Sequence, residues 1–568
     1  MNSIAANLTA FLKPKPTLSE PDVRHGLRMM TWEGIASLAM FSVTTSGLLA
    51  GFALALGANN LQIGILAAIP FIMQLLQIPA IWLVEQLRWR KAISVLSWLP
   101  AQLMWVLVAL IPFYAGVPGQ AAVGLLLGFM VVRGLLSAVT NCSWNSWVRD
   151  LVPQSIMGSF FSQRLAWGTV ASIIFGLVGA FFVDFWGVRT PLEEEIFGYA
   201  YVLLAGALFL GLASPWLMSH IPEPLMHPAA GPRPSLRRML SIPLQDRNFR
   251  QLGNFLFFWG FAANLAVPFF TIYMLQQLGF PLSAVIALNA LSQLAFVLFL
   301  RVWGTFVDRF GSKAVLSLSA SLYLLAIVGW TFTTLPDPYF LTIPLVIVLQ
   351  IFAGVAAAGV NLSMTTIGLK LAPQEQATSY MVAASLASNI GAGLGPLAGG
   401  LLADFFSERQ FSIAFGWVDA TRNIEFPAVH LAGFDFLFSI AFLIGLLTLN
   451  TLTTIREEGE VGRKEVLEEL LAPTREMART IGAIPGLRIL GGFPFAYLGH
   501  IPGVDVVLGV TAYEIASSVK TAATAARRGE RVMANISSQV SRAVARLVGE
   551  TEALGEQGIY LARHAARG

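Results

Sequence analysis

The stretch WGTFVDRFGSK, residues 303–313, lies between two long apolar runs. AVIALNALSQLAFVLFLRV precedes it and AVLSLSASLYLLAIVGW follows it. An aspartate, an arginine and a lysine therefore share a short connection with two glycines. Because about 20 apolar residues suffice to cross a bilayer as a helix, the pattern predicts two membrane-spanning helices joined by a tight polar turn.

The composition of the whole chain agrees with a lipid environment. Of 568 residues, 56% are hydrophobic and 12% are charged, and mean hydropathy is +0.68; a soluble domain carries about 25% charged residues. The basic residues flank apolar runs instead of forming a patch, so the net charge of +4 does not indicate a nucleic-acid partner. Cys142 is the single cysteine, which excludes an intrachain disulfide.

Apolar runs of spanning length recur twelve times, and their glycines and prolines are tolerated in membrane helices. The predicted spans are 32–56, 61–84, 92–113, 120–147, 165–187, 198–221, 253–276, 283–303, 314–334, 340–368, 379–404 and 431–453. The dyad alternation of a β-barrel is not visible in them. The fold class expected is an all-α polytopic membrane protein.

Lysine and arginine fall unequally on the two sides of these spans. Eighteen lie in the N-terminal leader and the connections on its side, against three on the other side. By the positive-inside rule, both termini are expected in the cytoplasm, with the chain multi-pass in the cell (inner) membrane. The regions expected are a cytoplasmic leader at 1–31, six spans at 32–221, a cytoplasmic loop at 222–252, six more spans at 253–453 and a cytoplasmic extension at 454–568.

The two sets of six spans show traces of a repeat. NCSWNSWVRDLVPQ at 141–154 and NLSMTTIGLKLAPQ at 361–374 share five residues at a constant offset of 220. Between spans two and three, VEQLRWRKA at 84–92 occupies the place of the opening stretch. Glu85 stands there in the position of Asp308, and Arg90 in that of Lys313.

These motifs resemble those of the major facilitator superfamily, over roughly residues 28–455. Its cytoplasmic-loop signature is matched by Gly304, Asp308, Arg309, Gly311 and Lys313. A second, helix-packing pattern is matched in span eleven by Gly391, Gly395, Pro396, Gly399 and Gly400. The resemblance implies two pseudo-symmetric six-helix bundles and a transporter of a small solute that works by alternating access.

The resemblance also implies a role for the opening stretch. Asp308 is expected to face the start of span five, where Arg164 lies, and to latch the cytoplasmic face shut. Glu85 and Arg90 would serve as the equivalent group in the first half. The alternative is that Arg309 and Lys313 only anchor the helices by the positive-inside rule.

Two ionisable residues stand out within or beside the hydrocarbon region, where such groups are costly. Arg133 falls in the middle of span four and resembles an arginine found there in proton-coupled members of the family; it is alternatively satisfied by backbone carbonyls. Glu33, at the mouth of span one, is a coupling candidate or a helix-start acid that complements the dipole.

Uncharged amides complete the set of candidate solute contacts, and the alternative for each is to hold helices together. They are Gln74, Gln77, Asn141, Asn264, Asn289, Gln293, Asn361 and Asn389. As a set they favour a neutral or weakly charged solute, with a coupling proton or sodium ion as a possible companion.

Motifs for nucleotide hydrolysis, metal binding or nucleophilic catalysis are not found, so neither an enzyme nor a cofactor is expected. The extension beyond 454 has apolar residues at helical spacing near 532–547, which favours a helix that contacts the membrane surface or a cytoplasmic protein. The alternative is that the extension is largely disordered. The alternative function is a non-transporting assembly or scaffold protein that acts through this extension.

Overall fold

The computed structural model describes residues 12–44, 47–115, 118–154, 156–191, 194–226, 236–334, 338–372, 377–418 and 423–455. The predictions for the extension, the start of the leader and the middle of the 222–252 loop lie outside these residues. What is described is mostly helical, because hydrocarbon offers no partner for backbone N–H and C=O groups and a helix satisfies them internally.

The first bundle contains six spans. They are α2 (Glu20–Thr44) with α3 (Gly47–Ala55), α4 (Asn60–Gln74) with α5 (Gln77–Leu87), α6 (Arg90–Tyr114), α7 (Gln120–Leu151), α8 (Met157–Arg189), and α9 (Glu195–Ala205) continued through the π-helix η2 (Gly206–Gly211) into α10 (Ala213–Ser219).

The second bundle repeats this arrangement. After α11 (Leu236–Gln245) come α12 (Arg247–Gln276), α13 (Leu282–Phe310), α14 (Ser312–Gly329) with the 3₁₀ turn η3 (Trp330–Phe332), α15 (Thr342–Lys370), α16 (Ala377–Phe406) and α17 (Phe434–Leu452), with strands β1 (Gln410–Val418) and β2 (Asn423–Ala432) between the last two helices.

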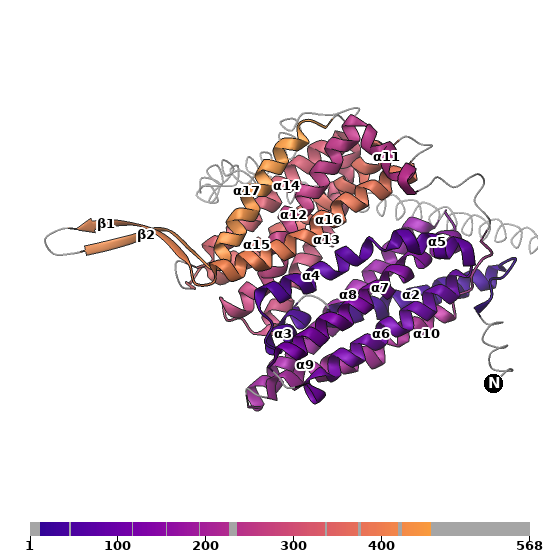
Figure 1. Ribbon diagram of the computed structural model, residues 1–568, viewed down its shortest axis with the longest axis horizontal. Helices are drawn as coiled ribbons and strands as arrows, with labels where there is room; N and C mark the ends of the chain where they lie inside the picture. Colours follow the sequence, from indigo (N-terminus) through magenta and orange to yellow (C-terminus); the bar gives the residue numbers. More distant parts are fainter. Residues whose placement is uncertain are drawn as a thin grey trace, which may run out of the picture. The chain divides into compact units, whose positions relative to one another are not determined.

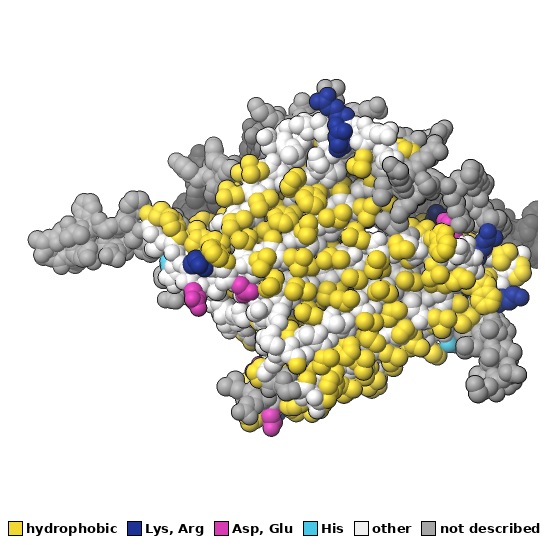
Figure 2. Space-filling model, in the orientation of Figure 1, with side chains coloured by type: hydrophobic (Ala, Val, Ile, Leu, Met, Phe, Trp, Pro, Cys, Tyr) yellow, Lys and Arg dark blue, Asp and Glu magenta, His cyan; other side chains and the backbone are white. Residues whose placement is uncertain are grey.

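Eleven of the described helices are long and apolar enough to cross a membrane, and a twelfth span is the bent pair α4–α5. The two halves of that pair meet at 45°, next to Pro79, whose ring excludes a regular helical hydrogen bond. With this pair counted as one span, the predicted number of twelve is confirmed. In Figure 2 hydrophobic side chains cover the visible flank of the helices, with charged groups at its margins.

The helices run between two ends of the fold, which we name by what lies there. The leader end holds the start of α2, and the hairpin end holds the strands between α16 and α17 (Figure 1). Each bundle has its own apolar core, around Trp105 in the first and Tyr273 in the second. The bundles pack against each other where α4 meets α16 and where α8 meets α13.

The hairpin was not expected from the sequence. β1 and β2 pair antiparallel from Gln410↔Ala432 to Val418↔Asn423, with one irregularity after Ile413. The register pairs Phe411 with Leu431 and Ile413 with Val429. The last span consequently begins at Phe434 and not at 431.

The leader was also predicted too long, because the first helix begins at Glu20 and not at 32. The described segment before it is tied to the chain that follows α10. The Lys15 N–H donates to the Glu223 carbonyl at 2.9 Å, and the Leu225 N–H donates to the Lys15 carbonyl at 3.1 Å. These bonds fix the leader to the first bundle.

The glycines of α16 allow two neighbours to approach its backbone. A Cβ atom at Gly391 would lie 2.0 Å from the Phe257 carbonyl oxygen of α12, and one at Gly395 would lie 2.6 Å from that of Phe261. On another side, a Cβ at Gly400 would lie 2.6 Å from the Asn60 carbonyl oxygen of α4. Helix α16 therefore packs closely against α12 of its own bundle and against α4 of the opposite bundle.

We expect Gly391→Ala to destabilise the protein, because the added methyl group meets backbone and α12 must move away. The loss should be about 1–3 kcal/mol, as in overpacked cores, and should appear as a lower midpoint of thermal unfolding in detergent. Gly128→Ala is the matched control, since nothing lies within 4 Å of a Cβ there. An equal loss in both variants would contradict the role given to close packing.

Candidate functional site

Two aspartates join the bundles at the hairpin end. Asp184, near the end of α8, accepts from the Leu282 N–H at 3.0 Å and the Ser283 N–H at 2.8 Å, at the start of α13. Asp404, near the end of α16, accepts from the Asn60 N–H at 3.2 Å and the Leu61 N–H at 3.1 Å, at the start of α4. Each carboxylate caps free N–H groups and complements the positive end of a helix dipole.

The two caps are related by the internal repeat. Residues 176–185 read GLVGAFFVDF and residues 396–405 read PLAGGLLADF, so the offset of 220 also relates Asp184 to Asp404. The capped helix starts, Asn60 and Leu282, are related by nearly the same offset. The same kind of aspartate cap therefore closes the hairpin end of the interface at two places.

At the leader end, the opening stretch forms the turn between α13 and α14. Gly311 has φ 88°, a conformation that favours glycine. The equivalent turn of the first bundle places Arg88 at φ 53°, which costs a non-glycine residue about 1–2 kcal/mol. A Cβ at Gly304 would have only Leu362 nearby, at 3.8 Å, so this glycine is not required by packing here.

Arg164 has a different partner from the one predicted. It donates to Glu33 Oε2 at 2.6 Å and to the Met30 carbonyl at 3.0 Å, both on α2. Asp308 is exposed and forms no hydrogen bond with Arg164. Gly34 provides the room, because a Cβ there would lie 2.4 Å from Arg164 Nε. The ion pair joins two helices of the first bundle.

Glu33 is therefore not a helix-start acid, since α2 begins thirteen residues earlier, at Glu20. Its carboxylate is buried and accepts from the hydroxyls of Ser37 at 2.5 Å and Ser214 at 3.0 Å. The Ser214 hydroxyl in turn accepts from the indole N–H of Trp98 at 2.8 Å. A series of hydrogen-bonded side chains thus runs from the leader end into the first bundle.

Arg90 is likewise held inside the first bundle. It is fully buried, donates to Asp150 Oδ2 at 2.5 Å and to Glu223 Oε1 at 3.3 Å, and also reaches the Pro224 carbonyl. Glu223 accepts in addition from the Arg90 and Lys91 backbone N–H groups. Burial raises the pKa of the Glu223 carboxyl above its ordinary value, against these hydrogen bonds. The cluster secures the start of α6.

Arg133 lies on α7 against two tryptophans of α6. Its guanidinium carbon is 4.9 Å from the ring centre of Trp105 and 5.9 Å from that of Trp98. In the described part of the chain its Nε has no hydrogen-bond partner. The carbonyl-satisfied alternative therefore does not describe this arginine.

The predicted amides do not gather into one cluster. Gln77 donates to Gln74 at the bend between α4 and α5, and Gln350 donates to Asn289 at 3.3 Å across α13 and α15. Three others donate within their own helix: Asn264 to the Gly260 carbonyl, Asn361 to the Ala357 carbonyl and Asn389 to the Ser385 hydroxyl. Among the described residues, Asn141 and Gln293 form no side-chain hydrogen bond to another of these amides. Gln350 lies within the predicted tenth span but was not among the amides predicted to contact the solute.

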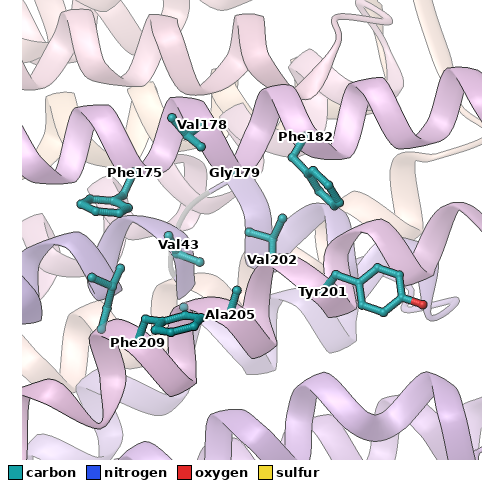
Figure 3. A pocket seen from close by; sticks show the side chains of 11 residues that line it. Val43, Phe175, Val178, Gly179, Phe182, Tyr201, Val202, Ala205 and Phe209 are labelled. Carbon is teal, nitrogen blue, oxygen red and sulfur yellow. The ribbon is translucent and has the colours of Figure 1, made fainter.

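A groove of about 350 Å³ lies between α8 and α9 and continues along η2. Figure 3 shows Phe175, Phe182 and Phe209 on its walls, and Tyr201 bears the one hydroxyl among the lining side chains. Phe209 is 77% exposed on a membrane span. A surface this apolar is suited to contact hydrocarbon and offers no groups to orient a polar solute.

Comparison with known families gives a match to the Major Facilitator Superfamily over residues 252–529. The match spans 278 of the 568 residues, and most of them lie in the second bundle described above. It supports a multi-pass membrane transporter. The comparison with curated proteins gives no match.

Solved structures share the fold at low sequence identity. A variant of the nucleoside transporter NupG is similar with a TM-score of 0.59 and 14% identity, over 76% of this chain and 100% of that one. The D-xylose–proton symporter follows with 0.56 and 12%, over 78% and 100%. An inward-facing bacterial homologue of Spinster gives 0.51 and 18%, over 77% and 99%. At these identities the likeness concerns the fold.

We expect Glu33→Gln and Arg164→Gln each to lower stability by about 2–4 kcal/mol, because each leaves a largely buried charge without its partner. The double variant should lose less than the sum of the two. Thermal unfolding in detergent measures this, with Glu20→Gln as control, since the Glu20–Arg24 pair is exposed and worth at most about 1 kcal/mol. Additive losses would mean that the two side chains do not act as a pair.

Proposed function

We propose that the chain is a secondary transporter that moves a small solute by alternating access between its two bundles. The observation that carries the proposal is the pair of caps made by Asp184 and Asp404. They close one end of the interface with four N–H···O bonds to backbone, which open without unfolding either bundle. Each bundle keeps its own core. Such an interface suits rocking of rigid halves.

The proposed solute contacts are Arg133 and the amides. Arg133 is a half-buried cation in a membrane helix, and such groups are retained for function. The amides supply paired donors and acceptors: Gln74, Gln77, Asn141, Asn264, Asn289, Gln293, Asn361 and Asn389. Glu33 is the proposed coupling group for a proton or sodium ion, because its buried carboxylate has two serine hydroxyls and one arginine as partners.

At the leader end we propose that Asp308, Arg309 and Lys313 act when that end closes. Asp308 is exposed on the last turn of α13 and available for a helix start or a cation of the opposite bundle. The leader end is proposed to face the cytoplasm, on the strength of eighteen Lys and Arg residues against three. Glu85 and Arg90 then belong to the first bundle's own scaffold and not to the gate.

Truncating the chain distinguishes transport from the alternative function, a scaffold that acts through the extension. The described part of the chain ends at residue 455, just after α17, so a truncation at Arg463 removes only residues of the predicted extension. A transporter should retain uptake in proteoliposomes when the chain ends after Arg463, whereas a scaffold should transport nothing in either form. We favour transport because Arg133 is a cation within a membrane helix, where such groups are costly and retained for function.

We expect Arg133→Ala to abolish uptake of the solute while expression and thermal stability stay near those of the native chain. Uptake is measured in proteoliposomes with a panel of labelled neutral solutes and monocarboxylates. Arg133→Lys should retain partial activity at most, since lysine lacks the planar donor fork. Arg189→Ala is the matched control, because this arginine also stacks on an aromatic ring but at the hairpin end. Full uptake by Arg133→Ala would remove Arg133 from the proposed site.

A further inference from the structure

Four buried polar atoms without a hydrogen-bond partner lie on α6 and α7, with Gln102 Oε1 next to Gly211 of η2. They are Gln102 Oε1, Trp105 Nε1, Arg133 Nε and Ser137 Oγ, and they make up half of all such atoms in the described residues. We call these four residues the α6/α7 patch. Because buried polar groups are nearly always hydrogen-bonded, four unpaired ones in one place require an explanation.

The patch is compact by helix geometry. Gln102 and Trp105 are about one turn apart on α6, and Arg133 and Ser137 are one turn apart on α7, so each pair shares a face. The guanidinium carbon of Arg133 is 4.9 Å from the Trp105 ring centre, which ties the two faces together. Gln102 and Trp105 are each only 1% exposed. Arg133 is half-buried as a residue, although its Nε is buried.

The patch carries one uncompensated positive charge. No carboxylate among the described residues pairs with Arg133, whereas Glu33, the acid in the adjoining series of hydrogen-bonded side chains, is already neutralised by Arg164. The two indole faces attract the guanidinium but do not accept its N–H bonds in its plane. A buried cation without a counter-charge is costly, and an anion would relieve this cost.

The hydrogen-bond donors of the patch indicate which kind of acceptor it would bind. Arg133 Nε–H, Trp105 Nε1–H and the Ser137 hydroxyl are all able to donate, and the Gln102 amide presents its NH₂ end after a half-turn. Convergent donors around one positive charge suit an acceptor with one negative charge. The planar fork of arginine matches a carboxylate in particular. A dianion would leave a second charge unpaired.

We infer that the α6/α7 patch binds a carboxylate, with Arg133 as its counter-charge and Trp105, Ser137 and Gln102 as its hydrogen-bond partners. This rests on the proposed function in one respect: the carboxylate belongs to the transported solute, which is therefore a small organic monoanion. Trp98 and Trp105 line the patch with apolar rings, so the remainder of the solute nearest the carboxylate is apolar. A free halide is the other source of a single negative charge.

The test is thermal unfolding of the purified full chain in detergent, titrated at constant ionic strength with sodium acetate, propionate and benzoate, and separately with chloride and bromide. Sodium sulfate provides the dianion baseline. We expect the carboxylates to raise the unfolding midpoint in a saturable manner. Saturation by halides alone would overturn the assignment of a carboxylate, and the absence of any saturable shift would overturn the site.

Variants connect the shift to the patch. Arg133→Gln should lose the saturable shift, and Trp105→Phe, which keeps the ring but removes the donor, should raise the half-saturating concentration about fivefold, as for one lost hydrogen bond. Arg189→Gln, at the end of α8, should bind like the native chain. A shift that survives in Arg133→Gln would contradict the proposal. If Arg133→Gln does not fold, the test rests on Trp105→Phe. A half-saturating concentration equal to that of the native chain in this variant would contradict the patch.

Because this binding is measured without transport, the two proposals fail separately. Saturable carboxylate binding together with absent uptake would leave the site intact and remove the transport function. Uptake of neutral solutes only, with no carboxylate binding, would leave transport intact and remove this inference.

Discussion

The arrangement of the two bundles depends on how a carboxylate satisfies the start of a helix that belongs to the opposite bundle. The first N–H groups of any helix lack partners within it, and at the hairpin end Asp184 and Asp404 provide them. Charge-assisted bonds of this kind contribute about 1.5–3 kcal/mol each in favourable settings. The four bonds together favour a closed hairpin end.

The contacts within each bundle are of another kind. Arg90 is buried among Asp150, Glu223 and backbone carbonyls, and Arg164 is paired with Glu33. Breaking such buried pairs costs about 3–5 kcal/mol. These pairs therefore stabilise the first bundle as one body. Helix α16 takes part in both kinds of contact. Its glycines let it pack closely against α12, and its Asp404 caps the start of α4.

Much of this fold could be predicted from the sequence, because membrane spans and glycine patterns are local signals. The twelve spans and their family followed from hydropathy and from the motifs at 303–313 and 391–400. The partners of charged residues could not be predicted in this way. Arg164 was assigned to Asp308, yet the room left by Gly34 directs it to Glu33. The hairpin was overlooked, although QFSIAFGWV alternates as a strand does.

The central claim is that the two aspartates hold the hairpin end closed. It is tested most directly by electron-spin distance measurements in lipid, with labels at Val188 and Phe340, which are 88% and 85% exposed and lie in different bundles. Cys142 is replaced by serine. Against the Cys142→Ser parent, the additional pair Asp184→Asn and Asp404→Asn should shift the population toward longer distances, while labels at Ser159 and Thr305 at the leader end move closer. An unchanged distribution at both ends would contradict the account.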